Sequence, residues 1–327
     1  MHEIRDLLDR FPESRVLVVG DLMADKYIWT DALPAQGVNP SVLKASREDY
    51  ALGGAANVAH NLNDFGAEVF LCGLVGYDDA AHWFRRGCNE AGIETSGVFP
   101  VNDRPTTTKV RVMSADGSAP LFRIDYEVTD PPAETEMASM RTYIEHCMSL
   151  VDAIVLSDYD KGIFGHASFA REILDKAREM GKITVVESKA HLYEECHGAR
   201  LVILDDAQAE TYFLQETGSV PMGMEDTGRR VREALGCEVL AVLRADRELW
   251  IHYREGDAPR CTVAAVDEDK VLDATGVKDT VTGTLALGLV AGADIEQAAR
   301  LTVRAAEAVV QKVGTATVKL EELRRIV

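Results

Sequence analysis

The chain has 327 residues, of which 46% are hydrophobic and 27% charged, a composition typical of globular proteins. Its formal net charge of −19 argues against a nucleic-acid partner, because nucleic-acid binding needs a basic surface. The longest apolar runs are too short to span a bilayer, and the charged N-terminus MHEIRDLLDRF does not have the pattern of a signal peptide. We therefore expect a cytoplasmic protein with no membrane partner. Six scattered cysteines without a CxxC pair favour reduced thiols over disulfides or a zinc site.

Apolar runs along the chain predict the strands of a parallel sheet. The first, RVLVVGD (15–21), is continuous and ends in Gly-Asp, which predicts a buried strand. Further strands are expected at 68–76, 152–158, 183–187, 200–204 and 238–243. Helical patterns lie at about 54–65, 78–92, 132–150, 165–180, 223–236, 279–291, 294–312 and 319–326. Alternating strands and helices predict an α/β fold with a doubly wound, mainly parallel sheet.

Two regions depart from this alternation. Residues 25–50 contain several β-prone pieces, and residues 104–127 contain two expected strands, TTTKVRVMS and PLFRIDYE, joined by a turn at ADGS. We expect these regions to form a small antiparallel sheet that acts as a lid over the C-terminal edge of the main sheet. With no repeat or long linker, residues 1–327 are expected to form a single domain.

Candidate site residues follow several of the expected strands. Ligands of open parallel sheets bind beyond the carboxyl ends of the strands. Asp21, Asp158, Glu187 and the turn at 273–279 should therefore share one rim of the sheet. The sequence contains neither a Walker A motif nor GxGxxG, so it gives little support to a P-loop or a dinucleotide site.

The stretch LGGAANVAHNL (52–62) places two glycines before a predicted helix. Gly53 and Gly54 would permit close approach of a ligand or an unusual turn, and the helix N-terminus offers unpaired N–H groups. Asn57 would lie one turn into this helix. A plain junction between a loop and a helix is the alternative interpretation.

Charged residues near the lid suit a sugar phosphate. Asp21 and Asp25 could accept hydrogen bonds from sugar hydroxyls, or they could be solvated loop acids. Lys109, Arg111 and Arg123 on the lid strands could clamp a phosphate, although a charged outer face is the alternative.

The segment SDYDKG (157–162) places Asp158 and Lys161 at a strand end, where they could contact the ligand. On its own, this segment is also compatible with an acidic helix start.

The stretch DATGVKD (273–279) combines an anion site with a base. Gly276 precedes a helix N-terminus, which presents N–H groups and a partial positive charge to a phosphoryl group. Asp279 could accept the proton of an attacking hydroxyl, because phosphoryl transfer depends mostly on positioning and charge neutralisation. A helix cap with an acidic first turn is the alternative.

In order and spacing, these motifs resemble those of the ribokinase (PfkB-like) sugar kinases over nearly the whole chain. GGAANVAHN is similar to the first signature of that family, and DATGVKD occupies the place of the second. Within the family, the chain most resembles the bacterial heptose-7-phosphate kinases that form the first domain of ADP-heptose synthase. The stretches that carry this closer resemblance are VVGDLMADKY, GGAANVAHNL, RPTTTKVRV, FRIDYE, LSDYDKG and KVGTATV.

The resemblance implies a Rossmann-like domain with a β-sheet lid, ATP and Mg²⁺ as cofactors, and a homodimer through the lids. The implied reaction phosphorylates the anomeric hydroxyl of D-glycero-D-manno-heptose 7-phosphate, on the route to the lipopolysaccharide inner core. The nucleotidyltransferase domain that usually follows does not occur in these residues, so such an enzyme is expected to be stand-alone.

The resemblance also implies roles for individual residues. Asp279 would be the general base, and Lys278 and Gly276 would line the anion site. The sugar-phosphate side would comprise Asp21, Asp25, Gly53, Gly54, Asn57, Lys109, Arg111, Arg123, Asp158 and Lys161. The nucleotide side would comprise Lys189, Asp205, Gln208, Arg244 and Gly276, and no side chain is assigned to a metal.

The nucleotide side departs from the family pattern at several positions. The expected GAGD is GVKD, so that Val277 and Lys278 replace small residues next to phosphate. The expected metal-organising NxxE is Asp205-Asp206-Ala207-Gln208, and the expected DPK is Glu187-Ser188-Lys189. The strand end TRxxxG is LRADRE (243–248), and Val303 and Glu307 replace an Asn and a Gly of a late helix.

Three interpretations are compatible with these departures. The first, which we expect, is an active sugar-phosphate kinase in which Lys278 supplies a cation to the phosphoryl group. The second is a non-catalytic sugar-phosphate sensor or scaffold that has lost ATP binding. The third is a different sugar-phosphate activity, in which Asp279 and Lys278 transfer protons without ATP.

Overall fold

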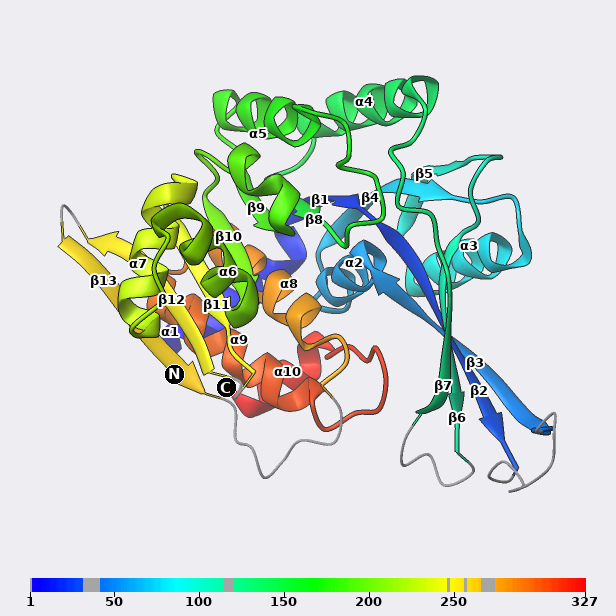
Figure 1. The fold of residues 1–327 in the computed structure, drawn as a ribbon. Coiled ribbons are helices and arrows are strands. Elements are labelled where there is room, and N and C mark those ends of the chain that lie inside the picture. Colours follow the sequence, from blue (N-terminus) through cyan, green and yellow to red (C-terminus); the bar gives the residue numbers. More distant parts are fainter. Residues whose placement is uncertain (1, 32–41, 115–119, 246–247, 256–257, 266–273) are drawn as a thin grey trace.

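The computed structural model describes residues 2–31, 42–114, 120–245, 248–255, 258–265 and 274–327. A nine-stranded sheet lies between two layers of helices, and a second, four-stranded sheet extends away from this body (Figure 1). None of the helices in this part of the chain combines the length and apolarity that a membrane span requires. The six cysteines are free thiols, as predicted.

The large sheet has the strand order β13-β12-β11-β10-β9-β8-β1-β4-β5. Its strands are β1 (Arg15–Gly20), β4 (Glu68–Val75), β5 (Glu94–Pro100), β8 (Ala153–Ser157), β9 (Ile183–Glu187), β10 (Leu201–Asp205), β11 (Val239–Leu243), β12 (Glu248–Glu255) and β13 (Ala258–Ala265). The strands from β11 to β5 run parallel, and β12 and β13 add an antiparallel edge. The six predicted strands are confirmed, whereas β5, β12 and β13 were not predicted because polar residues interrupt their apolar runs.

Helices cover both faces of this sheet (Figure 1). One layer contains α1 (His2–Arg10), α2 (Ala55–Asp64), α3 (Asp79–Ala91), α8 (Val277–Val290), α9 (Ile295–Val309) and α10 (Leu320–Ile326). The other contains α4 (Glu134–Met148), α5 (Phe169–Glu179), α6 (Asp206–Thr217) and α7 (Met224–Leu235). Along β1, Val16 and Val18 pack into the first core and Leu17 and Val19 into the second, because side chains alternate along a strand. The predicted doubly wound fold is confirmed, with α1 and α6 as additional helices.

The buried helix α8 lies against α2 and α9. Small residues make this close packing possible: a Cβ atom added to Gly288 would lie only 3.1 Å from the Cβ of Ala298. From Val277 to Leu289, every residue except Lys278 is buried. The N-terminus of α8 is therefore held rigidly by its own packing.

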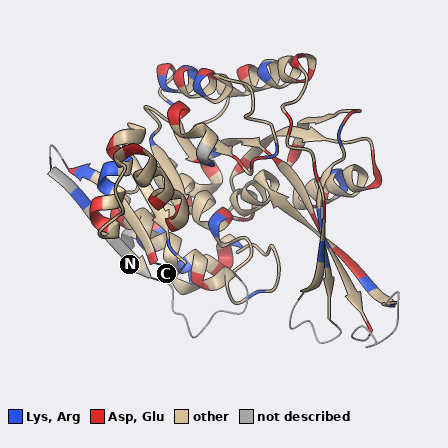
Figure 2. Ribbon diagram, in the orientation of Figure 1, with Lys and Arg blue, Asp and Glu red and all other residues tan. Residues whose placement is uncertain are grey.

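The small sheet has the order β3-β2-β6-β7. Its strands are β2 (Leu22–Thr30), β3 (Ala45–Gly54), β6 (Thr107–Met113) and β7 (Pro120–Tyr126). Charged residues of both signs lie along these strands (Figure 2). The predicted second sheet is confirmed, but it is mixed rather than antiparallel, because β2 and β6 both leave the same edge of the large sheet and pair in parallel. The predicted turn at ADGS (115–118) lies outside the described residues.

Candidate active site

Strands β1, β8, β9 and β10 bring four acidic residues to one edge of the large sheet, namely Asp21, Asp158, Glu187 and Asp205. Gly20, Ser157 and Glu187 are in register on neighbouring strands. Asp21 and Asp158 follow the first two of these strands. The common rim predicted for these residues is confirmed, and the described part of the 273–279 turn joins it through Asp279 and Tyr159.

Asp21 binds the backbone of the segment that follows β8. Its Oδ2 accepts hydrogen bonds from the N–H groups of Tyr159 at 2.8 Å and Lys161 at 3.1 Å, and its Oδ1 accepts one from Ile163 at 3.4 Å. Burial raises the pKa of this carboxyl, and these donors oppose the rise. Asp21 therefore fixes the position of the SDYDKG segment.

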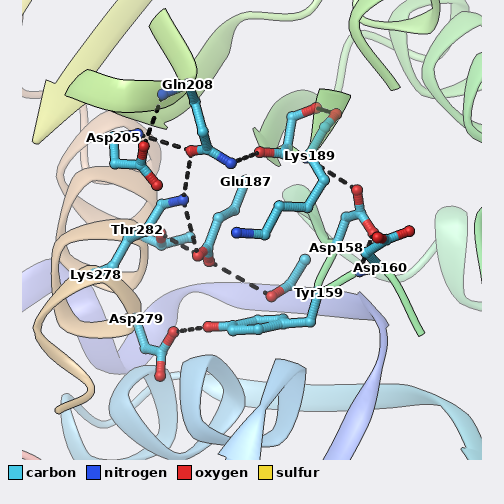
Figure 3. A network of polar contacts seen from close by, with 12 residues as sticks. Asp158, Tyr159, Asp160, Glu187, Lys189, Asp205, Gln208, Lys278, Asp279 and Thr282 are labelled. Atoms are coloured by element: carbon cyan, nitrogen blue, oxygen red, sulfur yellow. Dashed lines mark hydrogen bonds and ion pairs between the residues drawn. The ribbon is translucent and has the colours of Figure 1, made fainter. Parts of the chain in front are cut away.

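Asp158 connects the ends of β8 and β9 in a similar way. Its Oδ1 accepts from the N–H of Asp160 and its Oδ2 from the N–H of Lys189, both at 2.9 Å. Burial raises the pKa of Asp158 to about 6. The backbone of Lys189 is thereby held at the rim, and its side chain extends toward Glu187 (Figure 3).

Asp279 lies in the first turn of α8 and is buried. The Tyr159 hydroxyl donates to its Oδ1 (Figure 3), and Asn57 Nδ2 donates to its Oδ2. Burial raises the pKa of Asp279 to about 8, with a further rise from the charge of Glu187, while Tyr159, Asn57 and Lys278 oppose the rise. A carboxylate that titrates near neutral pH suits a general base.

Asn57 presents a second polar atom beside this carboxylate. Its Oδ1 is buried and accepts no hydrogen bond from the described residues. Buried polar atoms are almost always paired, so this oxygen fits a donor group on a ligand. Asn57 is thus placed, as predicted, one turn into the helix that follows the two glycines.

The predicted glycines make the approach of these elements possible. Gly54 has φ +57°, and a Cβ atom there would lie 2.4 Å from the Asp21 carbonyl oxygen. A Cβ on Gly53 would lie 2.5 Å from Asp25 Oδ2. Gly276, with φ +80°, caps α8, and its Cβ would lie 2.9 Å from Asn57 Nδ2. The glycines at 53 and 54 therefore form an unusual turn with close packing at the junction of β3 and α2, and close approach of a ligand there stays a prediction.

Lys278 reaches across the rim instead of projecting into solvent. Its Nζ lies 3.5 Å from Glu187 Oε1 and 3.2 Å from Gln208 Oε1 (Figure 3). Glu187 is buried and also accepts a hydrogen bond from Thr282 Oγ1 at 3.3 Å. The lysine therefore joins the start of α8 to the end of β9 and to the first turn of α6.

Asp205 and Gln208 form hydrogen bonds with each other at the start of α6. Asp205 Oδ1 accepts the Gln208 N–H, and Gln208 Oε1 accepts the Asp205 N–H, both at 2.8 Å. This reciprocal pair is a capping box, which satisfies donors at a helix start. Arg244 pairs with Glu248 across the turn from β11 to β12, at 3.6 Å.

The cations predicted on the lid are paired with carboxylates. Lys109 Nζ contacts Asp125 at 2.9 Å and also Glu127, and Lys161 Nζ lies 3.2 Å from Glu127. Arg111 pairs with Asp25, and Arg123 lies 3.0 Å from Asp125. A phosphate role for these cations stays a prediction, because it would require exchange of these partners.

Sequence reasoning missed two residues that complete the site. Tyr159 stands between the predicted Asp158 and Lys161, and Glu127 ends the FRIDYE stretch, so both lay inside motifs that had been singled out. Their partners are Asp279, which is far away in the sequence, and Lys109, which lies on the neighbouring lid strand. Only the fold shows these pairings.

The rim suits phosphate better than a resident divalent metal. The N-terminus of α8, Lys278 and Lys189 offer positive charge to a nucleotide phosphate. In the part of the chain that the structure describes, no group of three His, Cys, Asp or Glu side chains could by itself hold a metal ion. The Glu187 carboxylate already contacts Lys278. These residues fit the phosphates of ATP, and the described residues offer no site in which the protein alone would hold Mg²⁺.

Comparison with known proteins identifies relatives. The pfkB family of carbohydrate kinases matches residues 13–161 and 236–323. The Bifunctional protein HldE of Rhodopseudomonas palustris (strain BisA53) is 33% identical over 329 residues, which cover 99% of this chain and 66% of that protein. The Bifunctional protein HldE of Shewanella sediminis is 35% identical over 324 residues, covering 97% and 64%. The chain thus spans less than two thirds of the length of these relatives.

Solved structures share the fold. Arabidopsis thaliana ribokinase complexed with ribose and ATP superimposes with a TM-score of 0.69 at 18% identity, covering 96% of this chain and 98% of that one. Phosphofructokinase-2 of Escherichia coli in complex with potassium gives a TM-score of 0.75 at 15% identity, covering 96% and 97%. These likenesses establish a ribokinase-like architecture.

The two lid arginines should differ in their effect on stability. Arg111→Ala leaves Asp25, whose side chain is only 7% exposed, without its cation, so we expect the free energy of unfolding to fall by about 2–4 kcal/mol. Arg123→Ala is the matched control, since its side chain is 60% exposed and should contribute less than about 1 kcal/mol. Urea unfolding measures both free energies. Equal losses for the two variants would contradict the conclusion that Arg111 is the cation that stabilises buried Asp25.

Proposed function

This chain belongs to the pfkB family of carbohydrate kinases, and we propose that it transfers phosphate from ATP to the anomeric hydroxyl of D-glycero-D-manno-heptose 7-phosphate. The observation that carries the proposal is Asp279, a buried carboxylate with a raised pKa at a helix N-terminus. The heptose assignment is supported by the sequence motifs and by the HldE relatives. In that role the product would enter ADP-heptose synthesis in the cytoplasm.

The site residues would act on the sugar hydroxyl. ATP supplies the phosphoryl group: the sugar oxygen forms a bond to the γ-phosphorus, the bond from that phosphorus to the ADP oxygen breaks, and Asp279 takes the hydroxyl proton. Tyr159 and Asn57 hold the carboxylate in place by hydrogen bonds to its two oxygens. A carboxylate accepts about four hydrogen bonds, so both oxygens can still receive a substrate hydroxyl.

The sugar phosphate would lie between α2 and the lid. The unpaired Oδ1 of Asn57 would accept a hydrogen bond from a second sugar hydroxyl. We place the distal phosphate at Lys109 and Lys161, which share Glu127 as their partner. A phosphate dianion would replace that carboxylate, since it offers more acceptor oxygens and more negative charge to the two lysines.

A non-catalytic sugar-phosphate sensor or scaffold is the second candidate. It is favoured by the contacts of Lys278 with Glu187 and Gln208, which bridge the end of the site where a nucleotide would lie. The two candidates share a sugar site and differ in turnover. The presence of Asp279 favours the kinase, because a binder has no use for a base, and a turnover assay distinguishes the two candidates.

Asp279→Asn should abolish phosphorylation of heptose 7-phosphate while binding of that sugar survives. General-base catalysis contributes about 10²–10⁴-fold, so we expect a loss of at least that size in kcat. Asp160→Asn is the control, since its side chain is 72% exposed and it has a positive φ that asparagine tolerates. A coupled ADP-release assay with calorimetry of sugar binding measures both effects. Wild-type turnover by Asp279→Asn would show that another group is the base.

The pH dependence of kcat/KM should report Asp279. Since the ionised form is the base and its pKa is raised to about 8, activity should increase between pH 6 and pH 9. Tyr159→Phe removes a hydrogen bond that favours the ionised form, so the rise should move to higher pH. Tyr253→Phe, remote on β12, is the control. An unchanged profile in Tyr159→Phe would exclude Asp279 as the titrating group.

We also propose that the protein forms a homodimer through the outer face of the lid. Phe122, Ile124 and Tyr126 alternate along β7 and are 53%, 49% and 54% exposed. They lie on one face of the sheet, opposite the face that carries Asp25 and Arg111. A second copy offers an identical apolar face, which a two-fold axis can match.

Phe122→Ser combined with Ile124→Ser should dissociate this dimer. We expect the solution mass by sedimentation equilibrium to fall from twice 35.8 kDa to 35.8 kDa. Met222→Ser, which removes a side chain 98% exposed at a different place, should leave the mass unchanged. A monomeric wild-type protein at assay concentration would rule out the lid interface.

A further inference from the structure

The first turn of α8 carries two opposite charges next to each other. From Val277 to Leu289, Lys278 and Asp279 are the charged residues, and the helix is otherwise uncharged. The Lys278 side chain is 20% exposed, so it is reachable from solvent while it spans to Glu187 and Gln208. A long, flexible cation is thus held beside the candidate base.

Glu187 explains why the lysine is held. Its side chain is 2% exposed, and its other contacts in the described part of the chain are the neutral hydroxyls of Thr282 and Ser157. A buried carboxylate without a cation is strongly unfavourable. The Lys278 ammonium is therefore the positive charge that compensates Glu187.

Lysine side chains lie beside the carboxylate at the end of β9. Lys278 contacts Glu187, and the side chain of Lys189 extends toward the same carboxylate (Figure 3). Mg²⁺ dehydrates reluctantly and usually binds one or two carboxylates together with phosphate oxygens. Because Glu187 already faces the Lys278 ammonium, it offers little negative charge to a divalent ion.

We propose that Lys278 takes the place of a divalent metal ion, and that the site binds a nucleotide polyphosphate without Mg²⁺. The proposal rests on the proposed function in placing the phosphoryl donor at the N-terminus of α8. An ammonium has three rotatable donors, and its distances of 3.2 Å and 3.5 Å to the present partners are long. Lys278 can therefore turn a donor from Gln208 to a phosphate oxygen while it stays beside Glu187.

Calorimetric titration of ADP into the full chain, in excess EDTA or in excess MgCl₂, tests this directly. We expect the wild-type protein to bind ADP at least as tightly in EDTA as in MgCl₂, because added Mg²⁺ would repel the ammonium. Lys278→Met should lose about tenfold or more of the affinity in EDTA, and MgCl₂ should restore part of it. Lys176→Met, which removes a lysine from an exposed ion pair, should behave like wild type.

Lys278→Met leaves Glu187 buried without a cation and could fail to fold. The double variant Lys278→Met with Glu187→Gln removes both charges, and it should show the same loss in EDTA. Wild-type binding that requires MgCl₂ would overturn the proposal. ADP binding by the double variant but not by wild type would also overturn it, by showing that the lysine closes the site. If neither the wild-type protein nor any variant binds ADP, the proposal is also overturned.

The outcome is separable from that of the proposed function. ADP titration involves no sugar and no turnover. A wild-type protein that binds ADP in EDTA, but does not phosphorylate heptose 7-phosphate in any buffer, would remove the sugar-kinase assignment and leave the role of Lys278 intact. Turnover that depends on Asp279 and also on Mg²⁺ would support the sugar-kinase assignment and remove the proposed role of Lys278.

Discussion

Four buried carboxylates at one edge of the sheet determine how the surrounding chain is arranged. Asp21, Asp158, Glu187 and Asp279 are each almost inaccessible to solvent. Taking a carboxylate out of water is unfavourable by several kcal/mol unless donors or cations replace the lost hydration. The segments after β8 and β9 and the start of α8 therefore fold so that their N–H groups, hydroxyls and one ammonium reach these anions.

The groups that contact each carboxylate indicate whether that carboxylate has a structural or a chemical role. Asp21 accepts three backbone N–H groups, which cannot move without unfolding the loop, so it is a fixed support. Asp279 is held by two neutral side-chain donors and is close to another negative charge. Neutral donors stabilise its ionised form less than a cation would. The pKa values of Asp158 and Asp279 are raised to about 6 and about 8, and Asp279 is the one of these two that is held by side-chain donors rather than by backbone N–H groups.

The sequence predicted the rim but not its pairings. Continuous apolar runs identified β1, β8, β9 and β10, and the parallel arrangement then placed Asp21, Asp158 and Glu187 together. Which partner each side chain finds depends on register and on packing between distant segments. Lys109 and Arg111 were predicted as cations for a phosphate, and the fold pairs them with carboxylates of neighbouring strands. Strand β12 (ELWIHYRE), whose apolar residues are interrupted by charged and polar ones, had no comparable signal.

Comparison of the sequence with the GAGD pattern left open whether Lys278 supplies a cation to the phosphoryl group or marks the loss of ATP binding. The structure places it against Gln208, which stands where the resembled pattern has the glutamate of NxxE. A glutamate at that position would add negative charge beside Glu187. The change from glycine to lysine and the change from glutamate to glutamine each make the rim more positive by one charge, whereas the change from the asparagine of NxxE to Asp205 makes it more negative by one. The net change is one positive charge, and the two residues that add positive charge, Lys278 and Gln208, are in contact. This contact is compatible with the proposed role of Lys278 in place of a metal ion.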